Sequence, residues 1–112
     1  MTDRDRTVRE RRRQEALDSL ELERQREVAL TTRLENVLRD LEAWRADEAA
    51  FARMEPDDAE VLRRIGFATR QPAEDARARL EGQIAGLEAD IADVRRRSRA
   101  YERYAEALEE PS

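Results

Sequence analysis

The side chains that could do chemistry are almost all carboxylates and guanidiniums. The chain has 27 Asp and Glu residues and 22 basic residues, every one of which is arginine. Histidine, cysteine and lysine are absent, which removes the usual zinc ligands, thiol nucleophiles and Schiff-base or P-loop lysines. The three serines, Ser19, Ser98 and Ser112, have no histidine to activate them. We therefore expect no enzyme, no metal site and no cofactor.

The remaining carboxylates could act as acids or bases only in a dry cleft that shifts their pKa values. A chain of 112 residues with 44% charged and 4% aromatic residues is not expected to build a thick core around such a cleft. This composition is typical of a long helix or a disordered tail, and the hydrophobic periodicity decides between them.

The positions of glycine and proline divide the chain into three helical segments. The first is rich in strong helix formers and ends at Glu55-Pro56, because the residue before a proline is disfavoured in the α region. Gly66 is the expected left-handed cap of a short second helix, and Phe67 is placed for the apolar contact that often follows such a cap. We predict one helical hairpin domain over residues 1–112, with a basic N-terminal arm at 1–16, a long helix at 17–54, an elbow with a short helix at 55–71 and a second long helix at 72–110.

Both long segments carry apolar residues in alternating steps of three and four, which is the a/d pattern of a coiled coil. We predict an all-α fold, an antiparallel two-helix coiled-coil hairpin with a short helical elbow. The predicted core is Leu30, Leu34, Val37, Leu41, Trp44, Phe51, Leu80, Ile84, Leu87, Ile91, Val94, Tyr101 and Leu108.

One register sets Leu41 against Leu87 and Leu20 against Leu108. In that register Glu23 faces Ala105, and two further layers are polar on one side: Glu27 opposite Tyr101, and Leu30 opposite Ser98. The free end of the hairpin is then held less tightly than the elbow end. We expect the elbow residues Val61, Leu62, Ile65 and Phe67 to fold over Phe51 and Met54.

The N-terminal arm extends beyond the Leu20–Leu108 layer, so this register leaves it unpaired. It is either a solvated, frayed end or a docking arm for an acidic surface or phosphates. A net charge of −5 and the lack of interleaved aromatic residues argue against nucleic acid as the partner. We call the stripe of a and d positions the seam. The candidate partner-binding residues are Arg4, Arg6, Arg9, Arg11, Arg12 and Arg13 in the arm, with Leu17, Val28 and Leu38 as apolar residues off the seam.

Two other features have alternative interpretations. Arg95, Arg96, Arg97 and Arg99 form a second basic cluster, which we interpret as a solvated face with acidic partners one turn away. Gly82 and Gly86 have a spacing that permits close helix approach, so they indicate either a packed third helix or no specific role.

The segment from Leu41 to Phe51, with Trp44, Arg45 and Glu48, resembles a pattern near the end of the first long helix in the FliJ/YscO-type stalk proteins of type III secretion. The basic start at Thr7–Arg13 is similar as well. The resemblance implies a non-catalytic bacterial stalk that inserts into the ring of a secretion ATPase and links it to the export gate. The elbow between Pro56 and Pro72 departs from the family pattern, which puts the gate-binding role in doubt.

We therefore expect a cytoplasmic coiled-coil adaptor or stalk that contacts other proteins, with self-association as a further way to cover its apolar surface. No apolar run approaches the roughly 18 residues that span a bilayer, so we expect no membrane insertion. The alternatives are a small helical chaperone or inhibitor that sequesters a partner's helix, and a nucleic-acid-binding regulator that uses its arginine arm.

Overall fold

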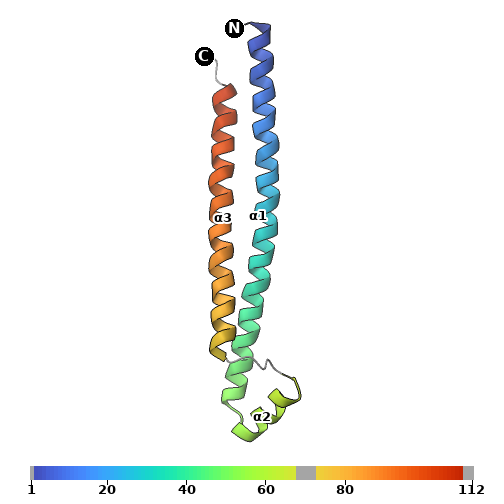
Figure 1. The fold of residues 1–112 in the computed structure, drawn as a ribbon, viewed down its shortest axis with the longest axis vertical. Helices are drawn as coiled ribbons and strands as arrows, with labels where there is room; N and C mark the ends of the chain where they lie inside the picture. The colour runs from blue at the N-terminus through green and yellow to red at the C-terminus, as the bar shows by residue number, and fades with distance from the viewer. Residues whose placement is uncertain (1, 68–72, 110–112) are drawn as a thin grey trace. The chain divides into compact units, whose positions relative to one another are not determined.

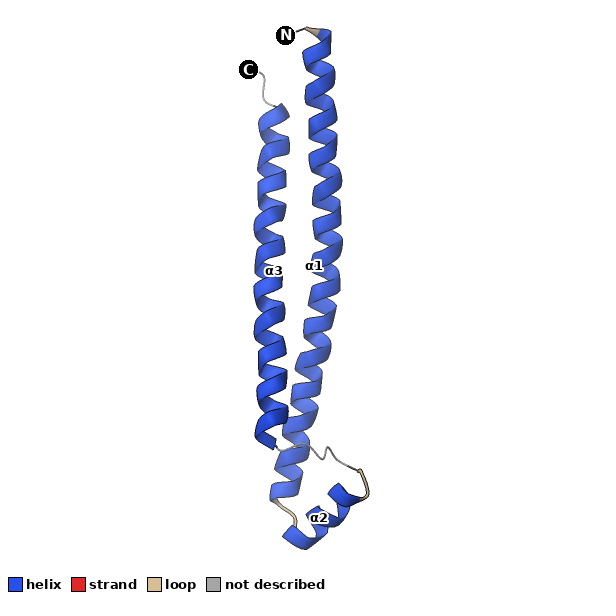
Figure 2. Cartoon of the chain, viewed as in Figure 1, coloured by secondary structure: helices blue, strands red, loops and turns tan. Residues whose placement is uncertain are grey.

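The structure, a computed structural model, describes residues 2–67 and 73–109. Three helices follow one another: α1 (Asp3–Ala52), α2 (Pro56–Arg64) and α3 (Ala73–Glu109). The long helices α1 and α3 pack side by side in opposite directions, and α2 lies in the connection between them (Figure 1). Figure 2 shows that every described element is helical. The predicted all-α antiparallel hairpin with a helical elbow is confirmed.

Local capping interactions explain where α1 begins. The backbone N–H of Asp5 donates to the Thr2 hydroxyl at 3.2 Å, and the Thr2 N–H donates to the Asp5 carboxylate at 3.4 Å. This reciprocal arrangement satisfies N–H groups that have no partner in the first helical turn. Asp3 and Asp5 also place negative charge at the positive end of the helix dipole. Most of the predicted basic arm is therefore helical and continuous with α1.

The short helix α2 has a strong signal at each end. Pro56 occupies its first turn, where no backbone N–H is needed. At the other end Gly66 has a φ of 78°, its N–H donates to the carbonyl of Arg63, and the N–H of Phe67 donates to the carbonyl of Leu62. These two bonds form a Schellman motif. The predicted glycine cap is confirmed.

The described chain divides into two compact units. Unit 1 combines Met1–Thr32 with Glu88–Ser112, and unit 2 is Arg33–Leu87. In unit 1 the buried residues are Ala16, Leu20, Glu23, Ile91, Val94 and Ala105. In unit 2 they are Leu41, Phe51, Ala59, Ala76, Leu80 and Leu87. The other predicted core residues, Leu30, Leu34, Val37, Trp44, Ile84, Tyr101 and Leu108, are half-buried.

The helix register in unit 1 differs from the predicted one by a heptad. Ion pairs join Glu23 to Arg97 and Arg13 to Glu109. They place Ala16, rather than Glu23, level with Ala105. The predicted Leu20–Leu108 layer is therefore wrong. A seven-residue shift keeps a and d positions facing each other, so the apolar pattern alone could not exclude it.

Unit 2 has the same offset. Trp44 and Asp40 share a shallow surface hollow with Ala76 and Leu80, so Leu41 lies level with Leu80. The predicted Leu41–Leu87 layer is wrong for the same reason.

The predicted burial of the elbow is also largely wrong. Val61, Ile65 and Phe67 are 56%, 70% and 76% exposed, so they do not cover Phe51 and Met54. Ala59 is the α2 residue that is buried. Phe67 is 76% exposed, so the expected apolar contact after the cap covers at most a small part of its side chain.

Candidate functional site

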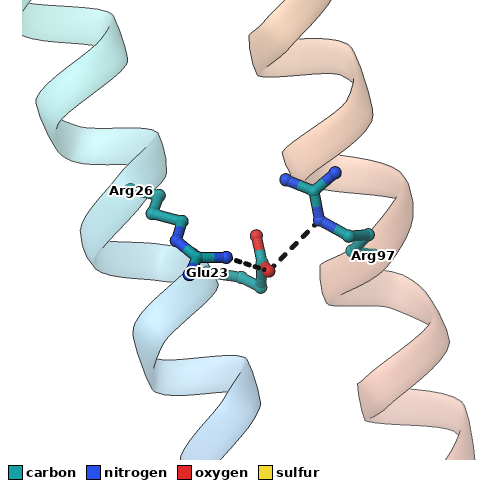
Figure 3. A network of polar contacts seen from close by, with 3 residues as sticks. All are labelled: Glu23, Arg26 and Arg97. Carbon is teal, nitrogen blue, oxygen red and sulfur yellow. Dashed lines mark hydrogen bonds and ion pairs between the residues drawn. The ribbon is translucent and has the colours of Figure 1, made fainter.

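A buried carboxylate lies in the seam of unit 1. Glu23 is 4% exposed and is the one charged residue among the buried side chains of the described chain. Its Oε1 accepts from Nη1 of Arg26 at 2.8 Å and from Nε of Arg97 at 3.1 Å. Figure 3 shows that Arg26 approaches from the same helix, α1, and Arg97 from α3. The two guanidiniums offset the desolvation of the carboxylate, which would be large for an unpaired charge.

The second oxygen of this carboxylate lacks the hydrogen bonds that Oε1 makes. Oε2 of Glu23 is buried and has no hydrogen-bond partner among the described residues, and the same holds for the Ser98 hydroxyl oxygen. A buried acceptor without a donor loses the hydrogen bonds that it would make in water. The polar layer is therefore only partly satisfied, and Arg26 and Arg97 provide its charge balance.

A second interhelical ion pair lies one turn along. Glu27 is half-buried and its Oε1 is 3.5 Å from Nε of Arg95. Arg96 instead pairs with Asp93 on its own helix. Arg95, Arg96, Arg97 and Arg99 are exposed, so the predicted solvated face is confirmed. The predicted partners one turn away are wrong for Arg95 and Arg97, whose acidic partners lie on α1. The signal in the sequence was the pair of glutamates at seam positions, and the wrong register hid their partners.

The residues of the predicted arm fall into two groups. Arg4, Arg6, Arg11 and Arg12 are exposed, and Arg9 is half-buried and has an interaction partner. Arg13 pairs with Glu109 of α3, and Ala16 is 5% exposed. Residues near Arg13 therefore pack against α3 instead of projecting freely, because the heptad shift brings α3 alongside them.

The apolar candidates off the seam also differ from one another. In unit 1, Leu17 is half-buried and borders a shallow hollow with Leu20, Ala105 and the acidic end of α3, whereas Val28 is 67% exposed. In unit 2, Leu38 is 44% exposed. Val28 in unit 1 and Leu38 in unit 2 are therefore each exposed enough to contact a partner protein.

Three large apolar residues of unit 2 lie close together in the sequence and are exposed. We call Val61, Ile65 and Phe67 the α2 face. Val61 and Ile65 are four residues apart and share one side of the helical turn. Three large apolar side chains within seven residues, each more than half exposed, are typical of a contact surface. Sequence reasoning missed this face because it assigned the same residues to covering the hairpin.

Within residues 2–67 and 73–109, no group of three acidic side chains is arranged to hold a metal ion. None of the described helices is both long and apolar enough to cross a bilayer. No protein-family model, curated protein or solved structure matches the chain.

Proposed function

We propose that this chain is a non-catalytic coiled-coil adaptor that binds other proteins, and that the α2 face is its principal contact surface. The observation that carries this proposal is the exposure of Val61, Ile65 and Phe67, at 56%, 70% and 76%. Covering a solvated apolar surface is favourable by about 25 cal/mol per Å². Protein binding through such a face needs no catalytic group. The face also differs from the rest of the chain, which is rich in charged residues.

The specific role that we propose is that of a cytoplasmic stalk for a type III secretion ATPase ring. Two features support it: the antiparallel hairpin of α1 and α3, and the resemblance around Trp44 and Phe51 to the FliJ/YscO-type stalks. The exposed arginines Arg4, Arg6, Arg11 and Arg12 would complement an acidic surface on the ring or on the export gate.

A chaperone or inhibitor is the second candidate. It is favoured by the exposure of Val28 at 67%, because an isolated apolar side chain among charges on α1 could anchor a partner's helix. This function predicts a stoichiometric complex with one small helical protein, whereas the stalk predicts binding to an oligomeric ring.

The test is affinity capture of the tagged protein from its native cell lysate, with mass spectrometry of the co-purifying proteins. A triple variant, Val61→Ser, Ile65→Ser and Phe67→Ser, removes the α2 face. The matched control is Leu22→Ser, which changes an apolar residue of unit 1 that is 55% exposed. We expect a secretion ATPase or gate component with the unchanged protein and the control, and its loss with the triple variant.

Other outcomes would contradict this function. Capture of one small helical protein that is lost on Val28→Ser would select the chaperone. Recovery of nucleic acid that salt removes would select a nucleic-acid-binding regulator, because phosphate contacts weaken steeply as salt rises.

A further inference from the structure

The seam of unit 1 is compatible with two helix registers that differ by one heptad. In the observed register Ala16 lies level with Ala105 and Leu20 with Tyr101. After a shift of seven residues, Leu20 would lie level with Leu108 and Glu23 with Ala105. Leu20 meets a large, largely apolar side chain in both cases. Because the a/d pattern repeats every seven residues, burial of apolar surface does not distinguish the two registers strongly.

The polar contacts do distinguish them. In the observed register Glu23 pairs with Arg97 and Glu27 with Arg95. Seven residues after Arg97 and Arg95 come Tyr104 and Glu102. The shifted register would therefore replace one guanidinium by a phenol and the other by a like charge. Glu23 is 4% exposed and would keep only Arg26 of its own helix as an ion-pair partner, and removing one partner of a buried carboxylate is destabilising.

The remaining interhelical pair of this region does not choose between registers. Arg24 lies 3.1 Å from Glu102 through its Nη2. Seven residues further along α3 stands Glu109, another carboxylate. Arg24 would thus have an acidic neighbour in either arrangement, and the choice depends on the buried glutamate and its neighbour Glu27.

We propose that Glu23 and Arg97 select the register of this hairpin, and that the heptad-shifted register is an accessible second conformation when that pair is lost. This inference concerns the fold and does not depend on the proposed adaptor function. Polar residues at seam positions are known to specify register at a cost in stability. The partly satisfied carboxylate of Glu23 is consistent with such a cost.

Paired cysteines can report the two registers separately. The chain contains no cysteine of its own, so an introduced pair has no competitor. Leu20→Cys with Tyr101→Cys reports the observed register, and Leu20→Cys with Leu108→Cys reports the shifted one. The two positions on α3 are roughly 10 Å apart along the helix axis. A disulfide needs Cα atoms within about 7 Å, so one arrangement does not satisfy both pairs.

The decisive variants move or remove the charges without disturbing the apolar seam. With Glu23 present, we expect the 20/101 pair to close within one chain and the 20/108 pair to remain reduced under the same redox buffer. Exchange of Arg97→Tyr with Tyr104→Arg moves the guanidinium by one heptad at constant composition. We expect it to raise the extent of 20/108 closure at least about tenfold, and Glu23→Leu to do the same.

The matched control is Glu21→Leu, which removes an exposed carboxylate and adds the same side chain two residues away. It should leave the 20/101 pair dominant. Helicity measured by circular dichroism distinguishes a shifted hairpin from an unfolded one, and Glu23→Gln gives a size-matched second variant. If the exchange and both Glu23 variants stay helical and still close only the 20/101 pair, the inference is wrong.

Discussion

The guanidinium of Arg63 lies 4.9 Å from the centre of the Phe51 ring, over its face. This cation–π contact attaches the end of α2 to the last turn of α1. Ala59, one turn before Arg63, is buried on the same side of α2. With that side occupied, Val61 and Ile65 are directed to solvent. The contact between Arg63 and Phe51 thus explains why Val61 and Ile65 of the α2 face are exposed.

The register in unit 2 can be measured independently of unit 1. We expect cysteines at Leu41 and Leu80 to form an intrachain disulfide readily, because the two residues are level and buried at 6% and 8% exposure. Cysteines at Leu41 and Leu87 should remain reduced, since one heptad corresponds to roughly 10 Å. Gel mobility under non-reducing conditions gives the answer. If only the 41/87 pair formed a disulfide, the register predicted from the apolar pattern would be correct for unit 2.

Removal of Arg97 should cost more stability than removal of its neighbour. Arg97→Ala leaves the Glu23 carboxylate buried with Arg26 as its remaining ion-pair partner, and we expect a loss of about 1–3 kcal/mol in the free energy of unfolding. Arg96→Ala is the matched control. Its side chain is 67% exposed and pairs within α3, so the change should stay within about 0.5 kcal/mol. Urea unfolding followed by circular dichroism measures both, and equal losses would argue against a special role for Glu23.

Two valines of unit 1 provide a comparison at constant chemistry. Val94 is 2% exposed and is the largest fully buried side chain, whereas Val28 is 67% exposed. We expect Val94→Ala to destabilise by about 1–3 kcal/mol through lost burial and a small cavity. Val28→Ala should change stability by less than about 0.5 kcal/mol. A large loss at Val28 would show that it is covered in solution, for example by a second copy of the chain.

The glycines of unit 2 should respond in opposite directions. Gly82 and Gly86 are inside α3, and a Cβ added at either would meet no atom within 4 Å. Gly82→Ala and Gly86→Ala should therefore each stabilise by about 0.5–1 kcal/mol. Gly66→Ala should destabilise instead, because its φ of 78° disfavours residues with a Cβ. Destabilisation at Gly82 or Gly86 would support the alternative that a third helix packs there.

Trp44 tests how much of the seam is truly enclosed. Its side chain is half-buried, and its Nε1 is buried without a hydrogen-bond partner among the described residues. We expect Trp44→Ala to cost about 1–3 kcal/mol, below the range for a fully enclosed tryptophan. Trp44→Phe should cost less than about 1 kcal/mol, since it also removes an unsatisfied N–H group. Thermal unfolding measures the stability of both variants. A loss of stability for Trp44→Phe above the expected range would indicate that Nε1 has a hydrogen-bond partner.

The sequence by itself determined the elements of this protein and their orientation. Helix formers without glycine or proline specify α1, Pro56 and Gly66 specify the two ends of α2, and the a/d steps require the long helices to pack along one stripe. The helix bounds depend on residues close together in the chain, so local steric and hydrogen-bonding preferences predict them, and each apolar stripe lies within a single helix.

The tertiary structure alone decided the register and the exposure of α2. A heptad repeat is nearly degenerate to a seven-residue shift, so long-range pairs such as Glu23 with Arg97 had to break that degeneracy. Arg63 and Ala59 lie on the side of α2 that packs, and Arg63 contacts Phe51 at the end of α1. No pattern within α2 predicts this contact. Both outcomes depend on side-chain contacts between different helices, which the residues of one helix do not determine by themselves.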